Sequence, residues 1–280
     1  MPEEQWTRIG PRNYGLPRKR DQTTAILGGA CEAGRDCYRG SRGIGEATAR
    51  ALARDGLAVA VADLDIGGAR RVADALGNGH GAFQVDVVEE HSVEQLFADV
   101  ESELGSVAVL ACVAGGPFLT PGRRPSIVET TTENWVRTEA LNSRGPFLCI
   151  RAMLRRRKDK PVTDGRIVTV SSMSGITPES PTGPAYSAAK AAVIHLTRVA
   201  ALEAAPMGIT VNTVAPGLTD TPAVRGDLTP QQIESARQAI PIGRLGTPQD
   251  IAETIAFLTS TRAGFITGAV IEANGGRQPP

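Results

Sequence analysis

Three segments near the start of the chain decide the fold: T-T-A-I-L-G-G at residues 23–29, S-R-G-I-G-E-A-T-A-R-A-L-A-R-D-G at 41–56 and L-A-V-A-V-A-D at 57–63. The first and third are short apolar runs bounded by turn residues, as expected of buried strands. The second has helical spacing and stops at Gly56, a typical residue just beyond a helix. A strand, a glycine-rich turn, a helix and a second strand predict a βαβ unit of a parallel sheet.

The turn and the acid that ends the second strand indicate a dinucleotide site. Glycines let backbone amides approach a pyrophosphate at the positive end of the helix. Asp63 is placed to accept hydrogen bonds from the adenosine ribose hydroxyls. We therefore expect NAD rather than NADP, because a carboxylate repels a 2′-phosphate. Arg42, beside the turn, argues mildly for NADP.

The segment C-E-A-G-R-D-C-Y-R-G at 31–40 interrupts this turn, which would otherwise read G-G-A-S-R-G-I-G. Three interpretations of this insert stay open. It is a surface excursion that leaves both ends of the turn in place, or a change that inactivates the turn, or a redox or metal device. The last is the weakest, because Cys31 and Cys37 alone do not complete a metal site. No cluster of His, Cys and carboxylates elsewhere suggests a metal.

The rest of the chain continues the alternation of apolar strands and helices. This pattern predicts an α/β fold, a single Rossmann-type doubly wound parallel sheet of about seven strands with helices on both faces. The expected organisation is a flexible arm at 1–22, one domain at 23–276 with the insert at 31–40 and a lid with a short helix at about 218–246, and a tail at 277–280. A long helix at about 133–157 ends in a basic run, which we interpret as a solvated cap.

Composition excludes some classes of partner. Thirty Lys and Arg balance thirty Asp and Glu, so no nucleic-acid partner is expected. No apolar run approaches the roughly 20 residues of a membrane span, and the first residues lack the apolar region of a signal peptide. The four cysteines are scattered. A cytoplasmic protein without a membrane partner is the expectation.

The stretch S-S-M-S-G-I-T-P-E-S-P-T-G-P-A-Y-S-A-A-K at 171–190 carries the chemistry. Tyr186 and Lys190 are four residues apart at the start of a predicted helix, so they share one face. An ammonium beside a phenol lowers the phenol pKa from about 10. Such a tyrosine can exchange a proton with an alcohol or ketone near neutral pH. Ser172 could hold the same oxygen.

Over residues 23–276 the chain resembles the short-chain dehydrogenases/reductases. The matching motifs are S-R-G-I-G, Asp63, Asp86-Val87, A-G-G at 114–116, L-N-S-R-G-P-F around Asn142, S-S at 171–172, Y-S-A-A-K at 186–190, V-N-T-V-A-P-G, G-R-L-G-T-P-Q-D-I-A and N-G-G. A Y-x-x-x-K pair alone would be weak evidence. The ordered set covers nearly the whole chain and is specific.

The resemblance implies hydride transfer between a secondary alcohol or ketone and nicotinamide C4. Tyr186 would be the acid/base, Lys190 would lower its pKa and bind the nicotinamide ribose, and Ser172 would polarise the substrate oxygen. Asn142 would hold a water that relays protons to Lys190. The implied cofactor-binding residues are Gly29, Ser41, Arg42, Gly43, Ile44, Gly45, Asp63, Leu64, Asp86, Val87, Val113, Ala114, Gly115, Tyr186, Lys190, Pro216, Gly217, Thr219 and Thr221. Family members commonly form homotetramers or homodimers through their long helices.

The chain departs from the family pattern at the insert and at two further points. Gly28 stands where the family usually has Thr, and Cys112-Val113 stands where it usually has Asn-Asn. Two rival hypotheses follow. One is an NADPH-dependent ketoreductase of the 3-oxoacyl type. The other is a non-catalytic dinucleotide-binding or regulatory protein, which the insert would favour.

Overall fold

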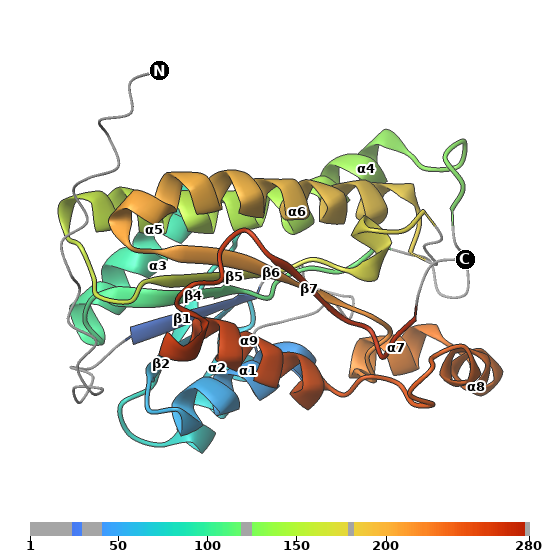
Figure 1. The fold of residues 1–280 in the computed structure, drawn as a ribbon, viewed down its shortest axis with the longest axis horizontal. Helices are drawn as coiled ribbons and strands as arrows, with labels where there is room; N and C mark the ends of the chain where they lie inside the picture. Colours follow the sequence, from blue (N-terminus) through green and yellow to red (C-terminus); the bar gives the residue numbers. More distant parts are fainter. Residues whose placement is uncertain (1–23, 30–40, 119–124, 179–181, 278–280) are drawn as a thin grey trace.

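A single seven-stranded parallel sheet organises the molecule (Figure 1). The computed structural model describes residues 24–29, 41–118, 125–178 and 182–277. The predicted arm at 1–22 and insert at 31–40 lie outside the described residues, as does the predicted tail except for Arg277. The strands are β1 (Thr24–Gly29), β2 (Ala58–Asp63), β3 (Gly81–Gln84), β4 (Val107–Cys112), β5 (Arg166–Val170), β6 (Thr210–Pro216) and β7 (Val270–Ala273).

The strand order is β3-β2-β1-β4-β5-β6-β7, and every pair is parallel. The chain runs outward from β1 to β3, then returns to the other side of β1 and continues outward from β4 to β7. The order therefore reverses between β1 and β4, where ligands of such sheets bind beyond the carboxyl ends of the strands. The predicted Rossmann-type fold is confirmed.

Helices cover both faces of the sheet (Figure 1). One face carries α1 (Gly43–Arg54), α2 (Ile66–Leu76) and α9 (Pro248–Thr259). The other face carries α3 (Glu90–Glu103), α4 (Thr132–Glu139), α5 (Gly145–Asp159) and α6 (Pro184–Ala204). The predicted lid holds two helices rather than one, α7 (Pro222–Asp227) and α8 (Pro230–Gln238). Pro230 restarts the helix directly after the Thr229 cap, which closes a capping box with Gln232.

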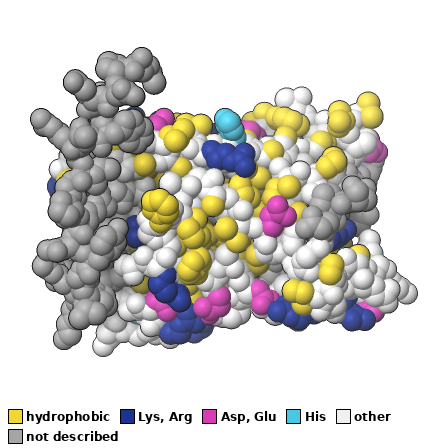
Figure 2. Space-filling model, in the orientation of Figure 1, with side chains coloured by type: hydrophobic (Ala, Val, Ile, Leu, Met, Phe, Trp, Pro, Cys, Tyr) yellow, Lys and Arg dark blue, Asp and Glu magenta, His cyan; other side chains and the backbone are white. Residues whose placement is uncertain are grey.

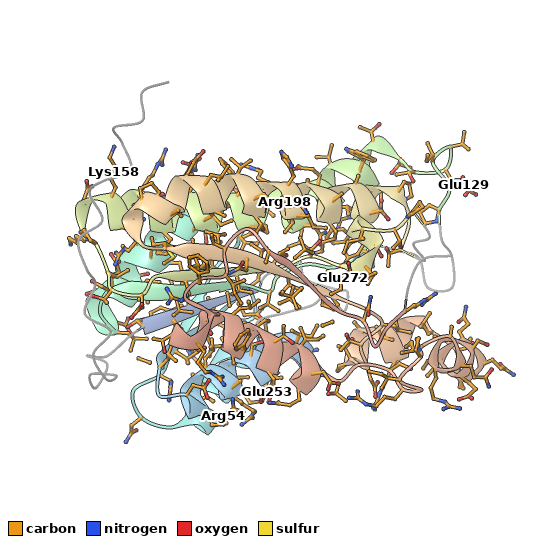
Figure 3. All side chains as sticks on the ribbon, viewed as in Figure 1. Arg54, Glu129, Lys158, Arg198, Glu253 and Glu272 are labelled. Atoms are coloured by element: carbon orange, nitrogen blue, oxygen red, sulfur yellow. The ribbon has the colours of Figure 1, made fainter. Side chains whose placement is uncertain are left out.

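Two apolar cores lie on opposite sides of the sheet, and β4 shows why. Leu110 and Cys112 face the core under α3, α5 and α6, whereas Val109 and Ala111 face the core under α1, α2 and α9. Successive side chains of a strand point to opposite faces, so a strand that is apolar throughout fills both cores. On the outer side, an exposed ion pair between Arg54 and Glu253 links α1 to α9 (Figure 3).

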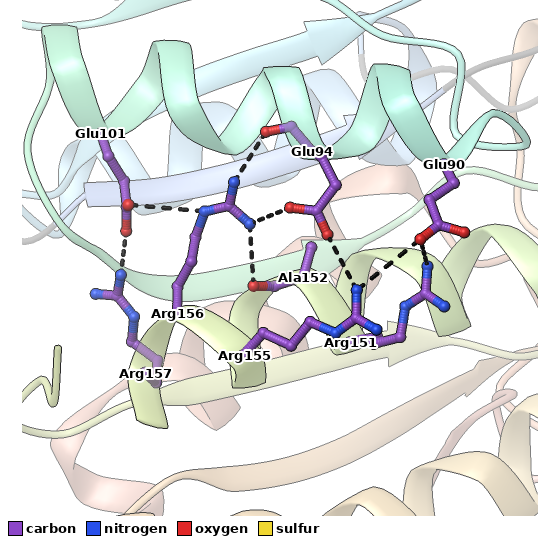
Figure 4. A network of polar contacts seen from close by, with 8 residues as sticks. All are labelled: Glu90, Glu94, Glu101, Arg151, Ala152, Arg155, Arg156 and Arg157. Carbon is purple, nitrogen blue, oxygen red and sulfur yellow. Dashed lines mark hydrogen bonds and ion pairs between the residues drawn. The ribbon is translucent and has the colours of Figure 1, made fainter. Parts of the chain in front are cut away.

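The basic end of α5 is not the solvated cap predicted from sequence. Its arginines face the acidic side of α3 (Figure 4). The pairs are Arg151 with Glu90, Arg155 with Glu90 and Glu94, Arg156 with Glu94 and Glu101, and Arg157 with Glu101. Arg157 is 1% exposed. The sequence prediction was wrong because it considered one helix alone, while the partners lie about sixty residues earlier in the chain.

This network makes a prediction about stability. Replacing Glu101 with Ala leaves the Arg157 guanidinium buried without its anion, and such a loss costs about 3 kcal/mol. Glu90→Ala is the matched control, because Glu90 is half exposed and a surface pair contributes less than about 1 kcal/mol. Urea unfolding of the two variants checks the difference. Equal losses in both would show that burial of Arg157 does not decide the energetics.

Candidate active site

The carboxyl ends of the central strands bring the predicted site residues to one edge of the sheet. Gly29 at the end of β1 lies opposite Asp63 at the end of β2, and Gly28 lies opposite Cys112 at the end of β4. Ser171 and Ser172 follow β5 directly. The edge therefore gathers segments that are up to about 140 residues apart in the chain.

Tyr186 and Lys190 lie on the first turns of α6 and are both buried, at 7% and 2% exposure. The Lys190 Nζ lies 5.5 Å from the centre of the Tyr186 ring. It donates a 2.9 Å hydrogen bond to the carbonyl of Val170, the last residue of β5. The pairing of these two residues on one helical face, predicted from their spacing, is what the structure shows.

The backbone of Lys190 is fixed from the opposite side by the loop after β5. Ser171 Oγ donates a 2.7 Å hydrogen bond to the Lys190 carbonyl. A Cβ at Gly175 would lie 2.6 Å from the carbonyl carbon of Lys190, so only glycine permits this approach. Ser172 stands between these contacts and caps the short helix Met173–Gly175 by accepting from the Ser174 N–H at 3.1 Å. The loop that carries Ser172 thus packs on the turns of α6 that carry the Tyr–Lys pair.

Asn142 sits in a π-helical segment (Ala140–Arg144) between α4 and α5 and is fully buried. Its Oδ1 accepts from the Gly116 N–H at 2.9 Å. Its Nδ2 donates to the carbonyls of Gly116 at 2.9 Å and Thr138 at 2.8 Å. Such π segments frequently mark functional sites. The segment turns Asn142 inward, against the loop after β4.

Gly115 joins Asn142 to the Tyr–Lys pair. A Cβ at Gly115 would lie 2.7 Å from Asn142 Oδ1 and 2.7 Å from Lys190 Nζ. The amide of Asn142 and the amine of Lys190 therefore meet over the Cα of Gly115. The sequence pattern A-G-G located this residue but not its steric role.

Burial controls the charge of Lys190. Desolvation lowers the pKa of Lys190 from its usual value to about 7, and the nearby Cys112 acts in the opposite direction. The Lys190 amine therefore changes its charge near neutral pH. A hydrogen bond with the Cys149 thiol and burial raise the pKa of the Cys112 thiol. Cys112 and Cys149 thus link β4 to α5 where the family usually places an asparagine side chain.

The edge beside β1 and β2, where the sequence predicted the adenosine ribose, is more occupied than the sequence suggested. Asp63 is fully buried. One carboxylate oxygen accepts from the Ser41 N–H at 3.0 Å and Ser41 Oγ at 2.8 Å, and the other accepts from the Asp65 N–H at 2.9 Å. Arg42 lies 3.9 Å from the Asp65 carboxylate, and Arg71 donates to the Ser41 carbonyl at 2.9 Å. The sequence did not single out Arg71, because nothing local connects it to the turn thirty residues before it.

The remaining predicted cofactor residues line the same edge. Val113 and Ala114 follow β4 and are buried. Val87 lies after β3 and is also buried. The carboxylate of the neighbouring Asp86 accepts from the Val88 N–H at 3.1 Å. Pro216 ends β6, Gly217 follows it, and Thr219 forms a β-bridge with Gly246. Ile44 and Gly45 are buried in the first turn of α1, and Leu64 follows Asp63 half-buried. Thr221 caps α7.

These residues fit a nicotinamide dinucleotide. The first N–H groups of α1 have no partners within their own helix, and they open at the point where the strand order reverses. A Cβ at Gly43, whose φ is 52°, would lie 3.4 Å from Thr221 Cγ2. The loop after β6 therefore packs against the start of α1. Among the described residues no group of three His, Cys, Asp or Glu side chains could hold a metal ion. Nor does the described part contain a helix long and apolar enough to cross a membrane.

A parallel sheet whose switch-point edge carries a buried Tyr–Lys pair defines a Rossmann-type oxidoreductase. Comparison with known proteins agrees. The sequence profile of the family described as "Enoyl-(Acyl carrier protein) reductase" matches residues 39–278. A cis-4-hydroxycyclohexanecarboxylate dehydrogenase from Sinomonas cyclohexanicum is 42% identical over 240 residues, covering 84% of this chain and 92% of that protein.

Two further proteins extend the comparison. A 3-oxoacyl-(acyl-carrier-protein) reductase from Vibrio cholerae is 36% identical over 84% of this chain and 93% of its own length. The solved structure of a short-chain type dehydrogenase/reductase from Mycobacterium marinum superimposes with a TM-score of 0.79 at 29% identity, covering 92% of this chain and 96% of the other. The chain belongs to the short-chain dehydrogenase/reductase family, and it is an NAD(P)-dependent oxidoreductase of the alcohol dehydrogenase/ketoreductase type.

The steric role of Gly115 can be tested directly. In Gly115→Ala the new methyl group would lie 2.7 Å from both Lys190 Nζ and Asn142 Oδ1, so the two side chains must separate. We expect turnover to fall by roughly 100-fold, the scale of a displacement of about 1 Å in a catalytic group. Steady-state kinetics measures it. Gly67→Ala is the control, since its Cβ meets Asp65 Oδ1 at an ordinary 3.4 Å. Wild-type turnover in Gly115→Ala would contradict this account.

Burial of Lys190 predicts a pH-dependent stability. Since the folded-state pKa is about 7 and the unfolded value is about 10.4, the unfolded chain holds the extra proton between these values. Wild-type stability therefore gains up to about 1.4 kcal/mol per pH unit from Lys190 as pH rises through this window, and loses it as pH falls. Lys190→Met removes this term, so the variant should exceed wild type most at pH 6. Urea unfolding at pH 6 and pH 9 measures it. A difference independent of pH would mean that Lys190 stays charged when folded.

Proposed function

We propose that this enzyme transfers a hydride reversibly between a secondary alcohol or ketone and a nicotinamide cofactor, with NAD favoured over NADP. The observation that carries the proposal is the buried Tyr186–Lys190 pair at the switch-point edge. The loop of Ser172 is held on one side of this pair and Asn142 on the other. This is the arrangement that proton transfer to a carbonyl oxygen requires.

Each side chain has a separate task. Tyr186 gives its phenolic proton to the substrate oxygen during reduction and takes it back during oxidation. The Lys190 ammonium, when charged, favours the phenolate. The Ser172 hydroxyl donates a hydrogen bond to the same substrate oxygen. Asn142 orders a water that returns protons to Lys190. When bound, the nicotinamide supplies or accepts the hydride.

The cofactor assignment rests on the first two strands and the α1 turn. Gly43, Ile44 and Gly45 hold the pyrophosphate at the start of α1. Asp63 takes the ribose hydroxyls in place of its bonds to Ser41. A carboxylate at this point disfavours a 2′-phosphate, so NAD is the favoured cofactor.

A specific observation supports the second candidate, an NADPH-dependent ketoreductase. Arg42 is exposed beside the turn, and Arg71 donates to the Ser41 carbonyl on the same side. Two guanidinium groups at the adenosine end can hold a phosphate. Their charge is offset by Asp65 and Glu46, which lie within 4 Å of them.

The substrate side lies at a constricted crevice next to Tyr186, which in this structure has no room for a water molecule. It is lined by Pro117, Phe118, Pro125, Asn134, Thr138, Thr182, Gly183, Pro184, Ala185 and Tyr186. The Sinomonas relative is named as a dehydrogenase of a secondary alcohol on a ring, and the Vibrio relative as a reductase of a 3-oxoacyl group, which is a ketone. Both names fit a secondary alcohol or ketone as the substrate of this chain.

Exposed apolar side chains support a homodimer or homotetramer that pairs its long helices. Trp135 and Val136 on α4, Phe147 on α5 and Leu202 on α6 are between 42% and 79% exposed. Hydrophobic side chains also gather across the middle of the face that carries α6 and β7 (Figure 2). Patches of this kind on helices mark contacts with another protein chain.

The proposal is tested with a panel of secondary alcohols and ketones, assayed with NAD(H) and with NADP(H). We expect turnover with kcat/KM at least about tenfold higher for NAD, equivalent to roughly 1.4 kcal/mol. Tyr186→Phe removes only the phenolic hydroxyl, and its kcat should fall at least roughly 100-fold. NADH fluorescence titration should show that this variant still binds the cofactor. Ser187→Ala is the control, because Ser187 Oγ bonds only its own helix, at the Gly183 carbonyl among the described residues.

Each of the other possible outcomes contradicts a different part of the proposal. A clear preference for NADPH would favour the second candidate, the NADPH-dependent ketoreductase. It would also contradict the argument that Asp63 selects NAD. No NADH binding at millimolar concentration would mean that the insert at 31–40 has closed the cofactor site. Retained activity in Tyr186→Phe would refute the catalytic assignment.

A further inference from the structure

The chain makes a tight turn directly after β7 that touches three parts of the active-site edge. We name residues Asn274–Gly276 the C-terminal joint. Asn274 Oδ1 accepts from the Gly276 N–H at 2.9 Å. Gly275 and Gly276 have φ of 68° and 84°, a backbone region that favours glycine. The asparagine side chain and two glycines thus fix the direction of the chain as it leaves the sheet.

The first contact of the C-terminal joint is with the turn after β6. The Gly217 N–H donates to the Ala273 carbonyl at 3.0 Å. A Cβ at Gly217 would lie 2.9 Å from the Cα of Asn274. Only glycine at position 217 allows the two backbones to approach this closely. The turn assigned to the nicotinamide end of the cofactor is therefore placed by Asn274.

The second contact is with the end of the lid, beyond α8. The Ile242 N–H donates to the Gly275 carbonyl at 3.2 Å. A Cβ at Gly275 would lie 2.6 Å from Ile240 Cγ2, and one at Gly276 would lie 3.4 Å from Pro241 Cβ. The segment at 240–242, where the lid returns to the body of the enzyme, therefore rests on the two glycines.

The third contact reaches the loop of the catalytic serine. Asn274 Nδ2 lies 3.3 Å from Met173 Sδ, and Met173 follows Ser172 directly. The same Nδ2 lies 3.2 Å from Glu272 Oε2 and 3.0 Å from the Arg277 carbonyl, so its two hydrogens serve three acceptors. Glu272 lies at the end of β7, beside the lid (Figure 3). The Asn274 amide thus connects Met173 in the serine loop with Glu272, which precedes the C-terminal joint, and with Arg277, which follows it.

We infer that Asn274 is a positioning residue for catalysis. It holds the Ser172 loop in register with the nicotinamide-end turn and the base of the lid. The inference rests on the proposed function, because it gives Asn274 its role through Ser172. The carbonyl side of the amide fixes the turn, whereas the NH2 side contacts Met173 in the serine loop as well as Glu272 and the Arg277 carbonyl. The two sides can therefore be separated by substitution.

Asn274→Asp separates them. The carboxylate still accepts from the Gly276 N–H, but it no longer donates to Met173, Glu272 or the Arg277 carbonyl, and it lies beside the Glu272 carboxylate. Met173→Leu removes the sulfur acceptor and keeps a similar volume. We expect kcat to fall about threefold to tenfold in each variant, the range for one lost hydrogen bond, with the KM for the cofactor unchanged. The double variant should fall no further than Asn274→Asp alone, because that variant has already lost the contact with Met173.

Asn78→Ala is the control for loss of an asparagine from an exposed turn, and it should keep wild-type kcat. Thermal unfolding of every variant separates positioning from loss of fold, and Met173→Leu tests the contact even where Asn274→Asp does not fold. Wild-type kcat in Met173→Leu, or effects that multiply in the double variant, would overturn the inference.

Ser172→Ala separates this inference from the function it rests on. If Ser172→Ala keeps full turnover, the proposed site is wrong and Asn274 has nothing to position. If Ser172→Ala is inactive while Asn274→Asp and Met173→Leu behave as wild type, the proposed function stands and only the role of Asn274 is refuted.

Discussion

The hydrogen bond from the Lys190 amine to the Val170 carbonyl is the contact on which the site depends. It brings an amine that is 2% exposed to the end of a central strand, where desolvation lowers its pKa to about 7. Burying an amine disfavours the folded state, and the surrounding chain is arranged to hold it in one place. Ser171 fixes its carbonyl, while Gly175 and Gly115 make room for its backbone and its Nζ. The chain therefore accepts a local loss of stability to keep the Lys190 amine beside Tyr186.

The strand order of the sheet explains why few residues are needed to build the site. Parallel strands end at the same edge, and the order reverses between β1 and β4. The described residues that directly follow β4, β5 and β6 consequently lie at one edge of the sheet. Glycine occurs where two of these loops meet: Gly115 against Asn142 and Lys190, Gly217 against Asn274, and Gly175 against α6. Close packing of backbones, rather than a large set of polar side chains, sets the geometry of the edge.

The sequence predicted what local patterns determine. Apolar strands alternating with helices gave the fold class, and spacing gave the shared face of Tyr186 and Lys190. Contacts between distant segments were not readable. The ion pairs between α3 and α5 were mistaken for a solvated cap, since each partner alone is an ordinary surface charge. The π segment that turns Asn142 inward depends on packing against Gly116. The Cys112–Cys149 contact needs the sheet to place α5 over β4.

Asp63 shows how one group can serve both the fold and the ligand. Among the described residues its carboxylate accepts hydrogen bonds from the Ser41 N–H, the Ser41 hydroxyl and the Asp65 N–H. A ribose diol would have to replace the Ser41 hydroxyl with bonds of equal quality, which is possible because both are neutral hydroxyl donors. A phosphate offers no donor in its ionised form and would place like charges together at a buried position. The Ser41–Asp63 contact thus holds the residues that lead into α1, and it is of a kind that a ribose hydroxyl, but not a phosphate, could take over.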